Sequence, residues 1–394
     1  MPALLGRPAK ALGAHAGRYI AQRDLRSCTQ IPLCVPAEMR ACVVPLQESP
    51  PLQRRQKACE IAEYAATRRR KGAGSATDTP EEKQGETGRI DRGGRAGSAG
   101  PCGTLNPAPA HHQPDSPMID LHVDFQRMYA ADDFGLTAER VDLTTQDGLR
   151  LVAYEVRRPN PKAVIIFLSG IQNPSVTAFF GHARWLAGHG YASLLLEMRA
   201  HGESEGDLIC LGYREHLDVR AAVDYLRASS AYDGVPIVVY GLSMGGATAI
   251  NAAGQIPEIA GVISMSAFSS WPDVFADNMA LQGAPAWLAA AEKPFVAAYM
   301  ALRFGPTNAG ITPARQIARL GDRPALLIHS RGDSQVPFAS FERLVARAPG
   351  HVETWVVEGD RHLIIDIDDY EHPERAHDYA ATILGFLERH WGGE

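Results

Sequence analysis

The sequence predicts an α/β protein whose central sheet is mostly parallel and carries helices on both faces. Two observations support this fold class. From residue 163 onward, short apolar runs rich in β-branched residues alternate with longer stretches of helical periodicity. Such alternation implies parallel strands joined by right-handed crossover helices. At one of these strand-to-helix transitions, within residues 235–251, glycines cluster where the strand gives way to the helix.

A hairpin opens the predicted sheet, because an Asp-Gly turn at Asp147 and Gly148 separates two strand-like runs, residues 138–143 and 149–156. The strands expected after it are 163–168, 191–197, 236–240, 259–267, 325–329 and 352–357. The helices expected between and after them are 176–188, 213–228, a helix from 244 onward, 337–348 and 377–391. Several of these strands are continuous apolar runs, which is typical of strands buried on both faces.

Ser243 lies in the sharp turn after the 236–240 strand, in the local sequence GLSMG. This sequence fits the pattern G-x-S-x-G, in which a strained strand-to-helix turn holds a nucleophilic serine clear of the backbone. Gly241, Gly245 and Gly246 would let strand and helix approach closely. The N–H of Met244, in the first helical turn, would point at an oxyanion. The alternative is a glycine-rich turn whose serine has no catalytic role.

Two later loops hold residues that could activate this serine. A serine hydroxyl needs a base within hydrogen-bond reach, and the base must be oriented by a third group. Asp333 follows the 325–329 strand, and His362 follows the 352–357 strand. Because parallel strands present active groups at their carboxyl ends, we expect Ser243, Asp333 and His362 to meet, with His362 as base and Asp333 as its carboxylate. Their chain order, Ser-Asp-His, differs from the two well-known protease orders.

Four local sequences carry a resemblance to a known family. These are GLSMGG at 241–246, GDSQVP at 332–337, GDRH at 359–362 and RAHGESEG at 199–206, the last similar to the family's R-G-H-G-x-S-x-G loop. Over residues 138–391 the chain resembles an α/β-hydrolase of the serine-aminopeptidase and monoacylglycerol-lipase-like branch. The resemblance implies the α/β-hydrolase fold, the triad of Ser243, Asp333 and His362, and a small helical cap over the carboxyl edge of the sheet.

The loop after the first buried strand departs from the family pattern. The family usually has His-Gly here, often with another glycine two residues on, whereas this chain has Ser169 in place of the histidine and Gln172 at the later position. A backbone donor does not depend on the identity of its side chain. The N–H groups of Ile171 and Met244 are therefore the predicted oxyanion hole. A side-chain donor from Gln172 or Asn173 is the alternative.

Other titratable residues near these motifs have structural interpretations that need no chemistry. We expect Asp360 to be a loop carboxylate, His201 to brace its glycine-rich loop, and His329 to be a core residue beside the Asp333 loop. Neither a set of residues at metal-ligand spacing nor a G-x-G-x-x-G after a strand is present in the sequence. We therefore expect no metal and no nucleotide cofactor.

An insert of about residues 271–322 is longer than a simple crossover. Its apolar residues have helical spacing, with breaks expected at Pro285, Pro294 and Pro306. As a cap, an apolar insert above a serine nucleophile would favour an acyl ester with an apolar portion. The alternative is that these residues only pack the cap onto the core.

The first 117 residues differ in composition from the rest of the chain. They carry 17 Lys and Arg against 11 Asp and Glu, and the remainder holds 22 of the 39 basic and 34 of the 45 acidic residues. Residues 1–117 are rich in Pro, Gly, Ala and Arg, and we expect them to be disordered, with 118–394 as the hydrolase domain. Open alternatives are Met118 as the true start, a transit peptide, or a basic localisation or nucleic-acid patch at 68–71.

Charge and cysteine usage exclude several classes for the body of the chain. An acidic body argues against nucleic acid as a partner. Apolar runs of 18 or more residues are absent from the sequence, so we expect no membrane span. Cys210 is the single cysteine after residue 117, which fits a reducing, cytoplasmic compartment.

The sequence-based hypothesis is a serine hydrolase that cleaves carboxylic esters through an acyl-enzyme, acting on a small-molecule acyl ester or a short peptide. A peptidase of the serine-aminopeptidase type is a second hypothesis. It needs a carboxylate in the insert for the substrate amine, and Glu292 and Asp273 are the candidates. A third hypothesis is a non-catalytic binding protein on a hydrolase fold. The sequence does not indicate an oligomeric state.

Overall fold

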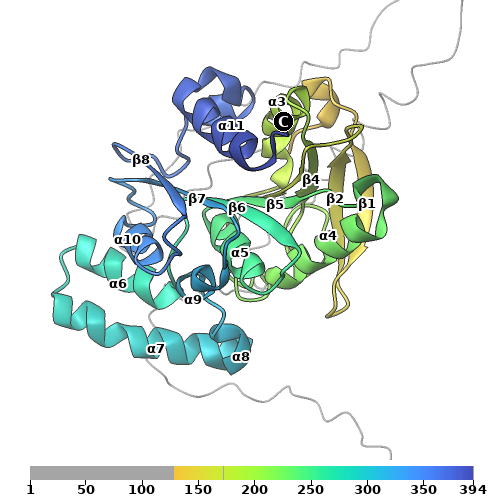
Figure 1. Ribbon diagram of the computed structural model, residues 1–394. Coiled ribbons are helices and arrows are strands. Elements are labelled where there is room, and N and C mark those ends of the chain that lie inside the picture. Colours follow the sequence, from red (N-terminus) through yellow and green to blue (C-terminus); the bar gives the residue numbers. More distant parts are fainter. Residues whose placement is uncertain (1–127, 172, 394) are drawn as a thin grey trace, which may run out of the picture. The chain divides into compact units, whose positions relative to one another are not determined.

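The computed structural model describes residues 128–171 and 173–393, and the disorder expected for residues 1–117 lies outside this part of the chain. One eight-stranded sheet organises the described residues, in the order β1-β2-β4-β3-β5-β6-β7-β8 (Figure 1). The strands are β1 (Glu139–Thr144), β2 (Arg150–Val156), β3 (Val164–Leu168), β4 (Ala192–Leu196), β5 (Ile237–Leu242), β6 (Ile259–Met265), β7 (Ala325–Ser330) and β8 (Glu353–Val357). Each predicted strand is present, with bounds shifted by one or two residues.

The sheet is antiparallel at one edge and parallel elsewhere. β1 pairs with β2, and β2 with β4, in antiparallel register, whereas the five remaining neighbours are parallel. The predicted turn closes the β1–β2 hairpin: Thr145 donates its hydroxyl to Asp147 at 2.7 Å, and Gly148 has a positive φ of 87°. The predicted mostly parallel α/β sheet is therefore confirmed.

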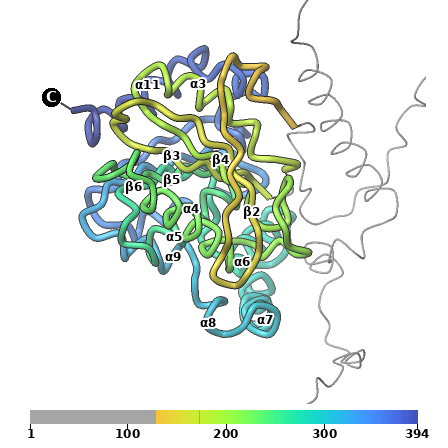
Figure 2. The backbone as a smooth tube through the Cα atoms, turned by 90° about the vertical axis from the view of Figure 1, so that its right-hand side faces the viewer, coloured from red at the N-terminus to blue at the C-terminus, as the bar shows by residue number. Residues whose placement is uncertain are grey.

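Helices cover both faces of the sheet. α3 and α11 lie on one face, and α4 and α5 lie on the other, as two views at right angles show (Figures 1 and 2). α10 lies on the same side as α5 (Figure 1). The α-helices are α3 (Phe180–Gly188), α4 (His216–Ala228), α5 (Met244–Ala253), α6 (Trp271–Leu281), α7 (Ala286–Phe304), α8 (Pro306–Ala309), α9 (Pro313–Gln316), α10 (Ala339–Val345) and α11 (His377–Trp391). The 3-10 helices are η2 (Ala131–Phe134), η3 (Val176–Phe179), η4 (Ser230–Tyr232), η5 (Ile317–Arg319), η6 (Ile367–Tyr370) and η7 (Pro373–Arg375).

The core follows the hydrophobic pattern of the sequence. Every residue of β3, β4, β5 and β7 is buried, as expected for apolar strands covered on both faces. On α11, Tyr379, Ile383, Phe386 and Leu387 are buried, at the spacing of one face of a helix. The central strands are therefore fixed from both sides, and their carboxyl ends form a rigid platform for the loops that follow them.

α4 begins at His216 rather than at the predicted Tyr213. The three residues before the helix stay in the preceding loop because the buried Glu215 carboxylate accepts hydrogen bonds from the N–H of Cys210, at 2.6 Å, and of Arg214, at 3.2 Å. Gly212 within this loop has φ 85°, which a right-handed helix does not allow. A buried side-chain acceptor thus delays the start of the helix, and periodicity alone does not reveal it.

The segment between β6 and β7 is helical, as its spacing predicts, but one expected break is wrong. Pro285 precedes α7 and Pro306 is the first residue of α8, whereas Pro294 lies inside α7. Pro294 is exposed, so the carbonyl that loses its helical partner can be hydrated. α7 is the outermost helix of this segment, and α6 lies nearer the body (Figure 1).

Candidate active site

Ser243 occupies a strained turn between β5 and α5. Its φ and ψ are 55° and −117°, a conformation that costs a non-glycine residue about 1–3 kcal/mol. Two backbone hydrogen bonds hold it there: its N–H donates to the carbonyl of Met265 at 2.8 Å, and its own carbonyl accepts from the N–H of Ala247 at 2.9 Å. The turn therefore keeps one side chain in a fixed, outward position at the carboxyl end of β5.

The glycines around this turn are required by close backbone contacts, which confirms their predicted steric role. A Cβ on Gly245 would lie 2.4 Å from the carbonyl oxygen of Leu168 and 2.5 Å from that of Ser169. A Cβ on Gly241 would lie 2.2 Å from the Gly245 carbonyl group. Helix α5 can therefore pack directly against β3 and β5 only because these side chains are absent.

We expect Gly245→Ala to lower the free energy of unfolding by about 3 kcal/mol, because its methyl group meets rigid backbone rather than a movable side chain. Urea denaturation monitored by circular dichroism measures the loss. Gly188→Ala is the matched control: this glycine ends α3 and its Cβ would meet nothing within 4 Å, so stability should be unchanged or raised. Equal stability of Gly245→Ala and the unmutated protein would contradict the tight contact of α5.

Asp333 and His362 form a hydrogen-bonded pair in the loops after β7 and β8. His362 Nδ1 lies 2.8 Å from Asp333 Oδ2, while Asp333 Oδ1 accepts the N–H groups of Gln335 and Val336, each at 2.9 Å. Burial alone would raise the pKa of Asp333, but the hydrogen bond and charge of His362, with help from His329 and the Val336 N–H, lower it below 3.8. The carboxylate is therefore ionised at neutral pH and orients the imidazole.

A second set of hydrogen bonds holds the two loops together. Ser334 N–H donates to Asp360 Oδ1 at 3.0 Å, and Arg361 N–H donates to Ser330 Oγ at 3.1 Å. Ser266, at the end of β6, donates its hydroxyl to the His362 carbonyl at 2.7 Å. Asp360 is thus a loop carboxylate, as predicted. The parts played by Ser266 and Ser330 were missed, and their only sequence signal is a serine at or just past the end of a strand.

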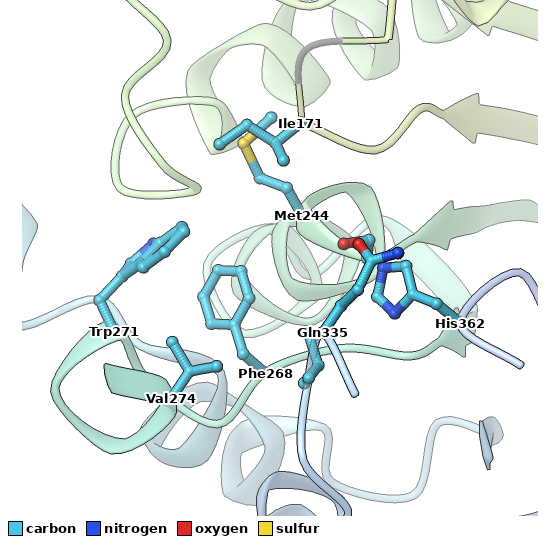
Figure 3. A pocket seen from close by; sticks show the side chains of 9 residues that line it. Ile171, Met244, Phe268, Trp271, Val274, Gln335 and His362 are labelled. Carbon is cyan, nitrogen blue, oxygen red and sulfur yellow. The ribbon is translucent and has the colours of Figure 1, made fainter. Parts of the chain in front are cut away.

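One pocket brings most of the predicted site residues together. Its walls are Ile171, Ser243, Met244, Phe268, Trp271, Val274, Gln335, Val336 and His362 (Figure 3). Asp333 does not line it and contacts the imidazole nitrogen Nδ1 instead. Ser243 and His362 share this pocket, and in the described part of the chain their side chains are not hydrogen-bonded to each other. In serine hydrolases, the hydrogen bond between the serine and its base is often long without substrate and tightens when substrate binds.

The loop after β3 lies beside Ser243. A Cβ on Gly170 would lie 3.6 Å from Ser243 Cβ and 3.4 Å from Asn173 Nδ2. Ile171 is a pocket residue, and its side chain lies next to that of Met244 (Figure 3). Both predicted oxyanion donors thus belong to segments that border Ser243. Asn173 is buried beside this loop, and Gln172 lies outside the described residues.

The rival histidines have structural partners. His201 Nδ1 lies 2.9 Å from the Arg199 carbonyl, and His329 Nε2 lies 2.8 Å from the Val336 carbonyl. Both rings are buried and neither lines the pocket. His201 therefore braces its loop and His329 packs beside the Asp333 loop, as the sequence predicted.

Two features of the described chain bear on metal ions and membranes. Within residues 128–171 and 173–393, His, Cys, Asp and Glu side chains do not gather in groups of three or more that could hold a metal ion. In the same residues, each helix is too short or too polar to cross a membrane.

The sheet, the strained serine after β5 and the Asp–His pair after β7 and β8 together define an α/β-hydrolase fold. A family model described as "Serine aminopeptidase, S33" matches residues 159–315, which include Ser243 but end before Asp333 and His362. The fold is similar to that of the esterase Pf2001 of Pyrococcus furiosus, with TM-score 0.51 and 22% identity over 68% of this chain and 98% of that one. It is also similar to the α/β hydrolase GrgF from Penicillium sp. sh18, with TM-score 0.50 and 18% identity over 66% and 100%. The chain therefore has the α/β-hydrolase fold.

Relatives found by sequence match part of the chain. The Bacillus subtilis protein YqkD is 26% identical over 202 residues, which are 50% of this chain and 63% of that protein. The quorum-quenching protein AidA of Acinetobacter baumannii is 33% identical over 116 residues, 29% of this chain and 36% of that protein. The chain thus spans less than two thirds of the length of either relative.

Proposed function

We propose that this protein is a serine hydrolase that cleaves carboxylic esters through an acyl-enzyme. One observation carries the proposal: Ser243, on a strained turn, shares a pocket with His362, and the buried Asp333 carboxylate holds the imidazole at 2.8 Å. A hydroxyl, an imidazole and a carboxylate in this relation can transfer a proton off the hydroxyl as it attacks.

In the proposed reaction Ser243 Oγ forms a bond to the ester carbonyl carbon while His362 Nε2 takes the hydroxyl proton. Asp333 keeps the proton of the ring on Nδ1 and stabilises the imidazolium. The N–H groups of Met244 and Ile171 stabilise the tetrahedral oxyanion. The intermediate expels the alkoxide, which His362 protonates, and leaves an acyl-serine. Water then attacks the acyl-serine with His362 as base, and the acid leaves as Ser243 regains its proton.

The pocket walls favour an acyl group with an apolar portion. Ile171, Phe268, Trp271 and Val274 supply apolar surface, and Trp271 and Val274 come from α6. Apolar walls with few polar groups suit an alkyl chain whose reactive carbonyl sits at the polar end.

We also propose that residues 118–394 form the hydrolase domain, with about 271–322 as its cap. Cys210, the single cysteine after residue 117, supports a cytoplasmic location.

Peptide hydrolysis is the second candidate, because the matching family model is described as a serine aminopeptidase. An aminopeptidase needs an unpaired carboxylate near the serine for the substrate ammonium. The Asp273 carboxylate already accepts hydrogen bonds from Lys293 Nζ at 2.8 Å and from the Ser270 hydroxyl at 2.6 Å. The other candidate, Glu292, does not line the pocket. The paired state of Asp273 therefore favours the ester over the peptide.

A substrate panel tests the proposal. We expect the protein to hydrolyse p-nitrophenyl acetate, butyrate and octanoate, to be labelled by a fluorophosphonate probe, and to act far more slowly on aminoacyl p-nitroanilides. Preferential cleavage of the anilides would replace the esterase with the peptidase. Neither hydrolysis nor labelling in a folded sample would indicate the third hypothesis, a binding protein on a hydrolase fold.

A further inference from the structure

Trp271, in the wall of the pocket, is held from outside the pocket by a loop that the proposed reaction does not use. Its indole N–H donates to the carbonyl of Leu211 at 2.7 Å. The side chain is buried, and its ring packs on Phe268 with centroids 4.8 Å apart. A large, flat side chain held at its polar end has one orientation, and that orientation sets the shape of the wall it forms.

The backbone of this loop is strained where it meets Trp271. Leu211 has φ 59° although it is not a glycine, and Gly212 follows with φ 85°. Consecutive positive φ values turn the Leu211 carbonyl toward α6. The Gly212 carbonyl accepts the side-chain amide of Asn251, from α5, at 3.0 Å. A strained conformation persists only where surrounding contacts over-determine it.

Glu215 supplies contacts on both sides of the strained residues. Its carboxylate, fully buried, accepts the N–H of Cys210 at 2.6 Å and the N–H of Arg214 at 3.2 Å. These two hydrogen bonds connect the residues on either side of Leu211 and Gly212. Burial, and next the nearby Asp218 charge, raise the pKa of Glu215 to about 7, against the opposing effect of Arg199. Burying an acid costs free energy, which its hydrogen bonds to the loop partly offset.

We propose that Glu215 is a positioning residue for the acyl pocket: it fixes the 210–214 loop, the Leu211 carbonyl holds Trp271, and Trp271 sets which acyl chains fit. This inference rests on the proposed ester hydrolysis. A glutamine at position 215 has one acceptor oxygen and one donor NH₂ group for two backbone donors, so one of the two contacts becomes repulsive. The loop then relaxes and the indole loses its fixed acceptor.

The test measures chain-length selectivity, the ratio of kcat/KM for p-nitrophenyl octanoate to that for the acetate. We expect Glu215→Gln to lower this ratio about fivefold, equivalent to about 1 kcal/mol, because the octanoyl chain reaches the Trp271 wall and the acetyl group does not. The ratio cancels any loss of folded protein, which affects both esters equally. In a Trp271→Phe background, which lacks the indole N–H, Glu215→Gln should change the ratio no further.

Glu155→Gln is the matched control for a buried carboxylate. Glu155 is buried on β2 and accepts the hydroxyls of Tyr232, at 2.6 Å, and Tyr225, at 2.8 Å, and it does not line the pocket. We expect this variant to lose stability while its octanoate-to-acetate ratio stays unchanged. A comparable fall in the ratio for Glu155→Gln would show a general effect of destabilisation and would overturn the role of Glu215.

A second measurement separates this inference from the proposed function. Hydrogen exchange of the Trp271 indole N–H, assigned by its loss in Trp271→Phe, should accelerate at least about tenfold in Glu215→Gln, whether or not the protein cleaves esters. Unchanged exchange, an unchanged ratio, or an equal effect of Glu215→Gln in the Trp271→Phe background would overturn the inference. An unmutated protein inactive on every ester would instead overturn the proposed function, and the exchange rate would still decide whether Glu215 holds Trp271.

Discussion

Ser243→Ala is expected to lower kcat for p-nitrophenyl butyrate by about a millionfold, the scale seen when a triad serine is removed elsewhere, and to abolish labelling by a fluorophosphonate probe. The substitution removes the atom that bonds to the carbonyl carbon and leaves the oxyanion donors in place. Alanine keeps the Cβ atom, so the backbone at position 243, with a φ of 55°, is about equally strained in both proteins. The fold should therefore survive, which circular dichroism and a thermal melt would verify.

The control for this variant is Ser193→Ala. Ser193 is fully buried on β4, and among the described residues its hydroxyl has no hydrogen-bond partner. Removing that hydroxyl should leave turnover and labelling unchanged and stability unchanged or higher. If Ser243→Ala retained ester turnover within tenfold of the unmutated protein, another nucleophile would carry the reaction and the proposed mechanism would be wrong.

Asp333→Asn should lower kcat by about 10⁴, as the equivalent change does in a well-studied serine protease. The argument depends on which groups surround the side chain. Its Oδ1 accepts two backbone N–H groups, from Gln335 and Val336, so an asparagine places its oxygen there and turns its NH₂ toward His362 Nδ1. The imidazole must then accept at Nδ1 and carry its proton on Nε2, the nitrogen that has to take the serine proton.

Asp360→Asn is the matched control, because Asp360 belongs to the same pair of loops. Within the part of the chain that the structure describes, its carboxylate accepts one hydrogen bond, from the Ser334 N–H at 3.0 Å. The amide oxygen of asparagine can accept that bond, so we expect kcat within about threefold of the unmutated value. Steady-state kinetics on one ester compares the two variants. A larger loss for Asp360→Asn than for Asp333→Asn would exchange their proposed roles.

Most elements of this fold follow from local sequence. Continuous apolar runs such as β3 and β5 are typical of parallel strands buried on both faces, and the glycines at 241 and 245 indicate a close contact between α5 and its neighbouring strands. Asp333 and His362 could be predicted because strand ends of a parallel sheet converge, and the structure does bring them within 2.8 Å. Their catalytic roles, and that of Ser243, are predictions for the kinetic experiments.

What local sequence did not predict depends on contacts between distant segments. α7 continues through Pro294 because that position faces solvent, and solvent exposure is a property of packing. Ser266 was overlooked because its hydroxyl acts on a carbonyl 96 residues away, that of His362. Pairings of this kind have no periodicity, and a polar residue at a strand end has the same local signature whether or not it finds a partner.

Taken alone, the order of residues determined the class of fold, the strained serine turn and the chemistry that the loop residues could perform. These depend on local rules, side-chain period and glycine geometry, and on the general rule that the ends of parallel strands meet at one edge of a sheet. Tertiary structure decided how the pocket is shaped. The Trp271 wall depends on the Leu211 carbonyl, and that carbonyl depends on the buried Glu215, a chain of contacts spanning 60 residues. The energy of such contacts comes from burial and hydrogen-bond geometry, which exist only after the chain has folded.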